Sequence, residues 1–494
     1  MLQRRRSALV VLWLLSMPGA IGLVAAQSLS PVELARIDDW YRRTAGRTAN
    51  GEWGIAIGTM DGLVLWSMSP ELELVPASTA KLYTTGFSRT QMGGDSRIRT
   101  SVIGEGRLEP TSGRWEGSWA LDLGGDPTLE RTGRNGPTLL ELARRLRESG
   151  VRVLEGPLAL TSRTGPATSH YPSVWSADFE GQLYAPPVGP VTLHENTVSL
   201  TFRPGLDVGS PPTLVSAFPD GVGRMVRIAA TTVPGSRSRL SLTPSADGGW
   251  VLNGSIGLWR RSAGLSAVAH DPSRLLGYVW ASALGRAGIR WINPGGPVPG
   301  LASPGASVLA QVESAPIDSV AVEVNRRSLN IGAELMLQWA AASQTTGPEL
   351  VMQHVRQVVG PSARVKLVDG SGLSELNRTT PLTQLLYLAR YPQLPGNSRF
   401  PLLLPANGTG TLRRLRQGMG RGVVHAKTGT LDDAAALAGY LGRPDGVLVL
   451  SLIYNGRRIH AARAAEWELF RILGAEGVSL SGALESQMGG DGAR

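Results

Sequence analysis

The hydrophobic pattern changes twice near the start of the chain. In residues 31–47 apolar side chains recur every three or four positions behind a proline, which predicts an amphipathic helix. Residues 51–68 instead alternate apolar side chains around Asp61-Gly62, the pattern of a β-hairpin. Residues 76–90 return to a helical pattern. A helix, a hairpin and a second helix are therefore expected in succession.

Further along, the pattern changes character near residues 97, 173, 265 and 316. The first of these segments combines strands with a helix over residues 138–148, which predicts a small α+β unit. Residues 173–264 contain short strands separated by glycine, proline and serine, which predicts an all-β insert. Helices dominate from residue 316 to 391, and strands then lead to a last helix over residues 457–473.

Composition indicates a globular protein of several domains. The 494 residues are 42% hydrophobic and 18% charged, and at about 100–200 residues per domain this length suggests two to four domains. The 62 glycines and 33 prolines stay below the roughly 25–30% that marks low complexity, so they punctuate many short elements. Because the chain has no cysteine, its stability has to come from core burial.

The two ends of the chain predict processing and a loose terminus. Residues 1–26 combine three arginines, an apolar run and small residues before Gln27, as a signal peptide does. We therefore expect export to the periplasm, the cell envelope or the extracellular space after cleavage of this peptide, with an uncleaved membrane anchor as the alternative. Residues 484–494 are expected to form a flexible tail.

Charge excludes some partners and favours others. The formal charge of +10 becomes +7 without the three signal arginines, which favours peripheral association with an anionic cell-wall or membrane surface. There is no run of five like charges and no basic region with interleaved aromatics, which argues against nucleic-acid binding. The six histidines show no metal-ligand spacing and no glycine-rich phosphate loop occurs, so we expect neither a metal nor a cofactor.

Ser78 and Lys81 have the spacing of a nucleophile and its base. Residues i and i+3 of a helix share a face, so the amine can lie beside the hydroxyl. A serine needs an adjacent base to attack a carbonyl, and lysine supplies one when its pKa is lowered. Lysine is also rare here: of the 49 lysine and arginine residues, only three are lysines, Lys81, Lys366 and Lys427. Arginine cannot take this role, since it does not lose its proton.

Lys427, Thr428, Gly429 and Thr430 form a second motif, on a predicted strand. Glycine lets a ligand backbone approach the strand, the threonines offer hydroxyls to a carboxylate, and the ammonium supplies a fixed positive charge. Between the two motifs, Ser328-Leu329-Asn330 falls between two helical stretches. Two of the three lysines in the chain thus belong to motifs suited to acyl transfer.

The order Ser-x-x-Lys, Ser-x-Asn, Lys-Thr-Gly matches the active-site triplet of penicillin-binding proteins and serine β-lactamases. The spacing of 250 residues between Ser78 and Ser328 is far longer than a β-lactamase allows. The chain resembles the D-alanyl-D-alanine carboxypeptidase/endopeptidase family, the low-molecular-mass class C penicillin-binding proteins, over nearly its whole length after residue 26. Besides the triplet, the resemblance rests on the segments PASTAKL, LGGDPTLE, NRRSLNIGAE, DGSGLS, GTGTLRRL and HAKTGTLDDAAALAGY.

This resemblance implies an α+β fold. A transpeptidase-like or serine β-lactamase-like domain, an antiparallel sheet flanked by helices, would carry a nested α+β insert and a mainly β insert. The expected units are a signal peptide (1–26), a catalytic domain (27–96 and 316–483), an α+β domain (97–172 and 265–315), an inner β-rich domain (173–264) and the tail (484–494).

The resemblance also implies site roles. Ser78 would attack the terminal D-Ala-D-Ala bond, or a D-Ala-containing cross-link, of a peptidoglycan stem peptide, and β-lactam antibiotics would inhibit by acylating it. Lys81, kept partly neutral by desolvation and the nearby Lys427 charge, would take the proton, and Ser328 would relay it to the leaving amine. Substrate binding would fall to Asn330, Lys427, Thr428, Gly429 and Thr430, and the backbone N–H groups of Ser78 and Thr430 would form the oxyanion hole.

Two other classes share these motifs. A β-lactamase uses the same acyl-serine but needs rapid deacylation, and the long insert counts against it. A catalytically silent peptidoglycan-binding scaffold has no reason to keep two lysines in an arginine-dominated chain. Within the segment DGSGLS, Asp369 could serve as a catalytic acid, but the glycines on either side of Ser371 favour a structural turn. Leu329 stands where family members often carry an acid, which would alter substrate preference.

Overall fold

The computed structural model describes residues 27–131, 136–163, 165–300, 304–341, 346–415 and 418–489. The expected signal peptide, residues 1–26, lies outside the described residues. Within them no helix has both the length and the apolar character needed to cross a bilayer.

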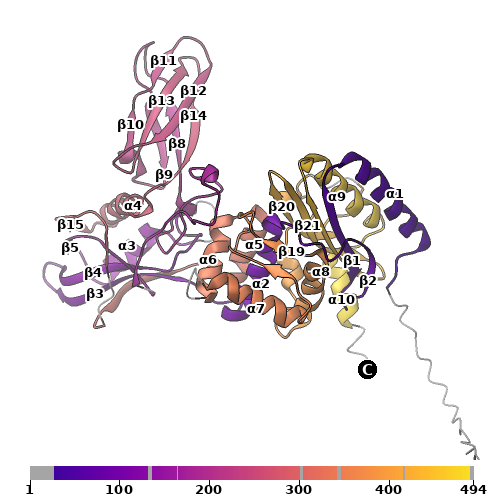
Figure 1. The fold of residues 1–494 in the computed structure, drawn as a ribbon. Helices are drawn as coiled ribbons and strands as arrows, with labels where there is room; N and C mark the ends of the chain where they lie inside the picture. Colours follow the sequence, from indigo (N-terminus) through magenta and orange to yellow (C-terminus); the bar gives the residue numbers. More distant parts are fainter. Residues whose placement is uncertain are drawn as a thin grey trace, which may run out of the picture.

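A five-stranded antiparallel sheet forms the centre of one end of the molecule (Figure 1). Its order is β2-β1-β22-β21-β20, so strands from both ends of the sequence lie side by side. The hairpin predicted around Asp61-Gly62 is β1 and β2, which places it at one edge. β20 lies at the other edge. The strands are β1 (Glu52–Thr59), β2 (Val64–Met68), β20 (Val424–Leu431), β21 (Ala434–Arg443) and β22 (Gly446–Asn455).

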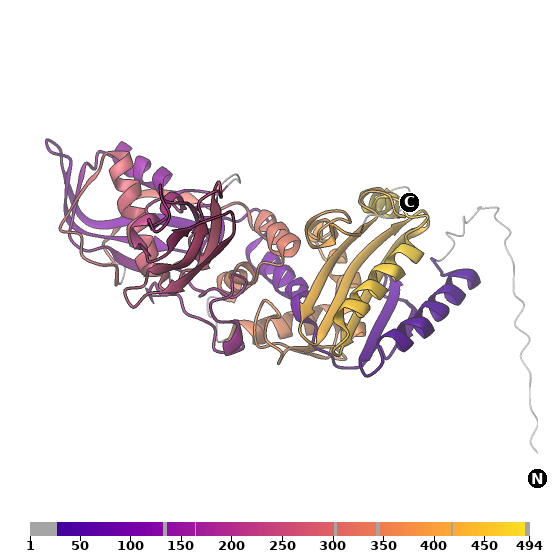
Figure 2. The same cartoon turned by 90° about the horizontal axis from the view of Figure 1, so that it is seen from above.

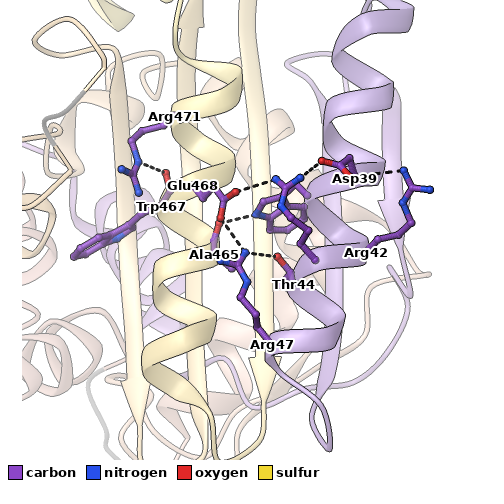
Figure 3. A network of polar contacts seen from close by, with 10 residues as sticks. Asp39, Arg42, Thr44, Arg47, Ala465, Trp467, Glu468 and Arg471 are labelled. Atoms are coloured by element: carbon purple, nitrogen blue, oxygen red, sulfur yellow. Dashed lines mark hydrogen bonds and ion pairs between the residues drawn. The ribbon is translucent and has the colours of Figure 1, made fainter.

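The outer face of this sheet is covered by α1 (Pro31–Arg47) and α9 (Ile459–Leu473), which Figure 3 shows from close by. The Ser30 hydroxyl accepts from the Glu33 N–H, while the Glu33 carboxylate accepts from the Ser30 N–H, so a capping box begins α1 as its sequence predicts. The buried Trp40 indole donates to the Ala465 carbonyl at 3.0 Å. An apolar core with Trp40 at its centre therefore fixes both helices on the sheet.

The inner face is covered by helices whose apolar side chains form a second core with the sheet. The predicted helix over residues 76–90 is divided in two. A 3-10 turn, η1, comes first, and the α-helix α2 begins directly after it at Lys81. A glycine at its C-terminus, Gly93, has φ +81°, which glycine adopts without strain. The elements are η1 (Ala77–Ala80), α2 (Lys81–Met92), α5 (Ile317–Arg327), α6 (Asn330–Ala341), α7 (Gly347–Val359) and α8 (Pro381–Arg390).

The chain leaves the catalytic end after α2 and comes back before α5. The two crossing segments lie next to each other, because Ile317 N–H donates to Ser96 C=O at 2.9 Å and Ser314 N–H donates to Ile98 C=O at 2.8 Å. Beyond this point β3 (Arg99–Glu109) and β17 (Ser307–Glu313) pair as antiparallel neighbours. An insert of more than 200 residues therefore leaves Ser78 and Ser328 on adjacent elements.

The inserted part forms the other end of an elongated molecule (Figure 2). An eight-stranded sheet carries helices α3 (Leu139–Glu148) and α4 (Pro272–Ala287), and a smaller β unit projects from it (Figure 1). One hydrophobic core runs through both parts. The larger sheet contains β3, β17, β4 (Arg114–Leu123), β5 (Val153–Glu155), β6 (Ala159–Ser162), β7 (Gly165–Pro166), β15 (Arg290–Ile292) and β16 (Val298–Pro299), and the smaller unit contains β8 (Thr197–Arg203), β9 (Thr213–Phe218), β10 (Val226–Ile228), β11 (Thr231–Val233), β12 (Ser238–Pro244), β13 (Trp250–Gly257) and β14 (Ala263–Val268).

The C-terminal part departs from the sequence-based expectation. A further helix, α10 (Leu480–Gly489), follows α9 and packs against β21 and β22. Leu480, Ala483 and Leu484 are buried there. Residues 484–489 are therefore helical and not part of a flexible tail, because the buried side chains of Leu480, Ala483 and Leu484 hold this helix on the sheet. Residues 490–494 lie outside the described residues.

Candidate active site

Ser78 lies in the 3-10 turn that directly precedes α2, and Lys81 is the first residue of that helix. The turn starts at Ala77, a non-glycine residue in the left-handed region with φ +47°, which is a strained conformation. Lys81 is fully buried, and its Nζ donates to Ser78 Oγ at 2.9 Å. The nucleophile and base predicted from their spacing are thus in direct contact.

Two further acceptors fix the Lys81 amine. Its Nζ donates to Asn330 Oδ1 at 2.6 Å and to the Ser371 carbonyl at 2.5 Å. Asn330 in turn donates from Nδ2 to the Tyr184 carbonyl at 2.8 Å, which sets the direction of its amide. Hydroxyl, amide and carbonyl groups bind this amine, and no carboxylate does so directly among the described residues. Such neutral partners leave the lysine free to lose its proton.

Burial lowers the pKa of Lys81 to about 7. Asp369 and Glu334 raise the pKa of Lys81 against the effect of burial. Lys81 and Lys427 repel each other, and this repulsion adds to burial in lowering the pKa of Lys427.

Asp369 holds the segment that presents the Ser371 carbonyl to Lys81. Its carboxylate accepts from the Gly372 and Ser374 N–H groups, both at 2.7 Å, from Asn377 Nδ2 at 2.9 Å and from Trp175 Nε1 at 3.2 Å. A carboxylate with all these partners organises a turn. This arrangement agrees with the structural role that the sequence favours for Asp369.

Glu334 is a buried acid whose importance the sequence analysis did not identify. It lies on α6, and its carboxylate accepts from the N–H groups of Gly370 and Ser371. Burial is the main reason why its pKa rises to about 7, and Asp369 adds to the effect. Its position inside the segment NRRSLNIGAE is the one sequence signal that could have indicated it.

Lys427 and Ser328 form a second amine–hydroxyl pair. Lys427 on β20 is fully buried, and its Nζ donates to Ser328 Oγ at 2.8 Å and to the Thr428 carbonyl at 2.6 Å. Ser328 ends α5 in the left-handed conformation with φ +58°, which directs it out of the helix before α6 begins. The strand lysine and the inter-helix serine, which the sequence places 99 residues apart, thus meet.

Gly429 permits the contact between β20 and η1, the turn that contains Ser78 and is called the serine turn below. A Cβ at this position would lie 2.6 Å from the Pro76 carbonyl oxygen and 3.0 Å from the Ser78 nitrogen. Both neighbours are backbone atoms, so they cannot rotate away. Thr430 follows on the strand with an exposed side chain, while Thr428 is buried. The structure therefore brings together all eight residues predicted for the site.

Replacing Gly429 by alanine is expected to separate β20 from η1. A displacement of about 1 Å in an active site can lower the rate by about 10²-fold, and we expect a loss of that order in acylation of Ser78 by penicillin. Gly264→Ala on β14 is the matched control, because no atom lies within 4 Å of a Cβ added there. Stopped-flow acylation of the two folded variants checks this; similar rates for both would contradict the role of Gly429.

A half-buried serine bonded to a buried lysine, with a second buried lysine on the edge strand of an antiparallel sheet, is the arrangement of a serine hydrolase that works through an acyl-enzyme. The chain belongs to the D-Ala-D-Ala carboxypeptidase 3 (S13) family, whose sequence model matches residues 38–473. This finding confirms the resemblance and the enzyme class that were predicted from the motifs.

Two curated relatives and one solved structure are similar to this chain over most of its length. The chain is 27% identical over 425 residues to the D-alanyl-D-alanine carboxypeptidase of Actinomadura sp. (strain R39), covering 81% of this chain and 77% of that protein. It is also 27% identical over 437 residues to carboxypeptidase DacB of Mycolicibacterium smegmatis, covering 83% and 78%. The crystal structure of penicillin binding protein 4 from Haemophilus influenzae has the same fold, with a TM-score of 0.70, 18% identity, and coverage of 87% of this chain and 98% of that one.

Proposed function

We propose that the protein is an exported serine-type D-Ala-D-Ala carboxypeptidase, and DD-endopeptidase, that acts on peptidoglycan stem peptides and cross-links. The observation that carries the proposal is the hydrogen bond from the amine of Lys81, which is fully buried and has a pKa of about 7, to the half-buried Ser78 hydroxyl. Membership of the S13 family supplies the class of bond. Inhibition by β-lactams is also part of the proposal. It is supported by a second structure of the Haemophilus influenzae penicillin binding protein 4, which contains a bound β-lactam.

In the acylation step, Lys81 removes the proton from Ser78, and Ser78 Oγ attacks the carbonyl of the penultimate D-Ala. Negative charge then develops on that carbonyl oxygen, which the N–H groups of Ser78 and Thr430 stabilise. Gly429 brings these two N–H groups to neighbouring positions, because its missing Cβ lets the strand touch the serine turn.

The leaving amine needs a proton when its C–N bond breaks, and the proton that Lys81 took from Ser78 has to reach it so that Lys81 is neutral again for the second step. Ser328 is placed to relay that proton. Its hydroxyl accepts from Lys427 at 2.8 Å, so its own hydrogen is free to point towards the departing amine. Lys427, Thr428 and Thr430 then bind the terminal carboxylate, and Asn330 holds the substrate amide. Water hydrolyses the acyl-enzyme, with Lys81 as the base for this step as well.

We propose the nested units expected from the sequence as the domain organisation, with α10 added to the catalytic domain. The inserts extend away from the five-stranded sheet of the catalytic domain (Figure 1). Cleavage of residues 1–26 and location in the periplasm or cell envelope complete the proposal, because peptidoglycan lies outside the cell membrane.

Fluorescent penicillin tests the proposal. Purified protein is expected to become covalently labelled, and the label is expected to be on the peptide that contains Ser78. The lifetime of this complex also separates the alternatives. A β-lactamase would release hydrolysed penicillin rapidly, whereas in a peptidase the penicillin acyl-enzyme lasts much longer than one turnover of the peptide substrate. Absence of any label, with the protein folded, would support the silent scaffold instead.

Acylation is expected to depend on pH through Lys81. Below its pKa of about 7 the amine is protonated, so the acylation rate should fall roughly tenfold per pH unit, while above it the rate should level off. Glu334→Gln removes a negative charge that raises the pKa of Lys81, so the midpoint of the variant should move to lower pH. Second-order acylation rates between pH 5 and 9 measure both midpoints, and a variant midpoint at higher pH would contradict this assignment.

A further inference from the structure

Arg463 reaches the active-site strand from the opposite face of the sheet. It lies on α9, and its side chain is only 16% exposed. One terminal nitrogen donates to Thr430 Oγ1 at 2.9 Å and to the Gly429 carbonyl. The other donates to the Ala436 carbonyl at 2.8 Å, and Ala436 is the register partner of Gly429 on β21. The guanidinium thus clamps the two strands at the end of the lysine–threonine–glycine motif.

We propose that Arg463 is a positioning residue for the reaction, which acts through the Gly429–Thr430 peptide and the Thr430 hydroxyl. The inference rests on the proposed function and adds to it a residue that determines recognition of the terminal carboxylate. No motif in the sequence indicates Arg463, because arginine is abundant in this chain and Arg463 lies 33 residues after Thr430.

The first part of the argument concerns the peptide that joins Gly429 to Thr430. In a trans peptide the C=O and N–H groups point in opposite directions. A guanidinium bound to the Gly429 carbonyl therefore fixes the direction of the Thr430 N–H, which is the proposed oxyanion-hole donor. A charged donor at the carbonyl also polarises the peptide, which makes this N–H a stronger donor.

The second part concerns the Thr430 hydroxyl. A guanidinium has only donors, so Thr430 Oγ1 accepts from Arg463 and cannot give its own hydrogen back. That hydrogen has to point to another acceptor. Because the Thr430 side chain is exposed, a substrate carboxylate can be that acceptor. Arg463 thereby turns a hydroxyl that could donate or accept into a donor aimed at an anion.

The third part concerns charge. Arg463 has an i,i+3 partner, Glu466, which is fully buried and accepts from its other terminal nitrogen. Burial raises the pKa of Glu466 to about 7 in spite of the adjoining guanidinium. The positive charge of Arg463 also helps to lower the pKa of Lys427. Two cations, Arg463 and Lys427, thus act on the short stretch that binds the carboxylate, and only the arginine keeps its charge at every working pH.

Arg47 offers a matched control on the other side of α9. It projects from α1 and donates to Glu468 Oε2 at 2.9 Å (Figure 3). Like Arg463 it helps to anchor α9, but in the part of the chain that the structure describes its side-chain hydrogen bonds go to Thr44 and Glu468, not to β20 or β21. A general loosening of α9 should therefore appear in Arg47→Met as well as in Arg463→Met.

The test compares two peptides that end in D-Ala-D-Ala, one with a free terminal carboxylate and one with a terminal amide. For Arg463→Met we expect kcat/KM on the free acid to fall about 10- to 100-fold, the range for a lost hydrogen bond to a charged group, and to fall less on the amide. Arg463→Lys should recover part of the preference for the acid, because one ammonium can replace the charge but not the fork of donors. Arg47→Met should keep the wild-type preference.

An unchanged ratio of acid to amide in Arg463→Met would overturn the inference. If Arg463→Met does not fold, Arg463→Lys decides: a folded lysine variant with a reduced ratio supports the inference, and one with the wild-type ratio overturns it. Penicillin titration gives the active fraction of each variant. Wild-type protein that releases no D-Ala from the acid would count against the proposed function itself, and so is distinct from a failure of Arg463 alone.

Discussion

Replacement of Lys81 by arginine is expected to abolish acylation of Ser78. A guanidinium stays protonated at any working pH, so it cannot remove the proton from the serine hydroxyl. General-base catalysis contributes typically about 10²–10⁴-fold, and we expect at least this loss in the rate of penicillin acylation. Stopped-flow fluorescence with a labelled penicillin measures the rate.

Lys81→Met is the second variant, since a fully buried site has little room for the larger guanidinium. Methionine carries no base but fills a similar volume. The lowered pKa of Lys81 means that the unfolded chain binds a proton more tightly, so the lysine opposes folding at pH 7 and this cost disappears as pH rises towards 10.5. Lys81→Met should therefore be at least as stable as wild type at pH 7, in thermal unfolding, yet inactive. Near-normal acylation by either variant would show that another group is the base.

Replacement of Ser78 by alanine is expected to remove both reactions of the enzyme together. Without the nucleophile there is no acyl-enzyme, and loss of a serine nucleophile can cost on the order of 10⁶-fold in kcat. We expect no penicillin label and no D-Ala release, because a single hydroxyl serves both. Gel fluorescence and a chromatographic assay for D-Ala measure them in the same preparation.

Ser88→Ala is the matched control for this experiment. Ser88 is a buried serine of α2, the helix that follows the turn containing Ser78; it donates to the Met336 carbonyl at 2.8 Å and lies outside the site. Its variant should keep the label and the activity, although it loses a buried hydrogen bond and hence about 1 kcal/mol of stability. A Ser78→Ala variant that still takes up label would show that a different residue is acylated.

The chemistry of this site could be predicted from the sequence largely because lysine is so rare. Lys81 and Lys427 are fully buried in the structure and bond to Ser78 and Ser328, whereas Lys366, for which no role could be argued, is exposed on a short strand. In a chain that uses arginine almost everywhere, a retained lysine marks a place where an amine able to lose its proton has a function.

Local signals also placed several elements. The α1 helix begins and ends where its proline and periodicity predict, and the helix predicted over residues 138–148 is α3, which Thr138 caps. Such features depend on neighbouring residues alone. The 3-10 turn that contains Ser78 was predicted as ordinary helix, because its strained start at Ala77 is imposed by β20 and the Gly372 segment, which are distant in sequence.

What the sequence could not indicate depends on packing between distant segments. Glu334 becomes significant only because the Gly370–Ser371 backbone lies on it, and Arg463 only because α9 crosses behind β20. The same limit explains α10: its apolar residues form a short, weak pattern, and Leu480, Ala483 and Leu484 are buried only because β21 and β22, which come earlier in the chain, lie against them.

The most direct test of the proposed function is digestion of defined muropeptides, with the products identified by mass spectrometry. Wild-type protein is expected to convert a monomeric pentapeptide to the tetrapeptide with release of one D-Ala, and to open a D-Ala-containing cross-link, while Ser78→Ala does neither. Recovery of both substrates unchanged after incubation with folded, penicillin-reactive wild-type protein would contradict the assignment.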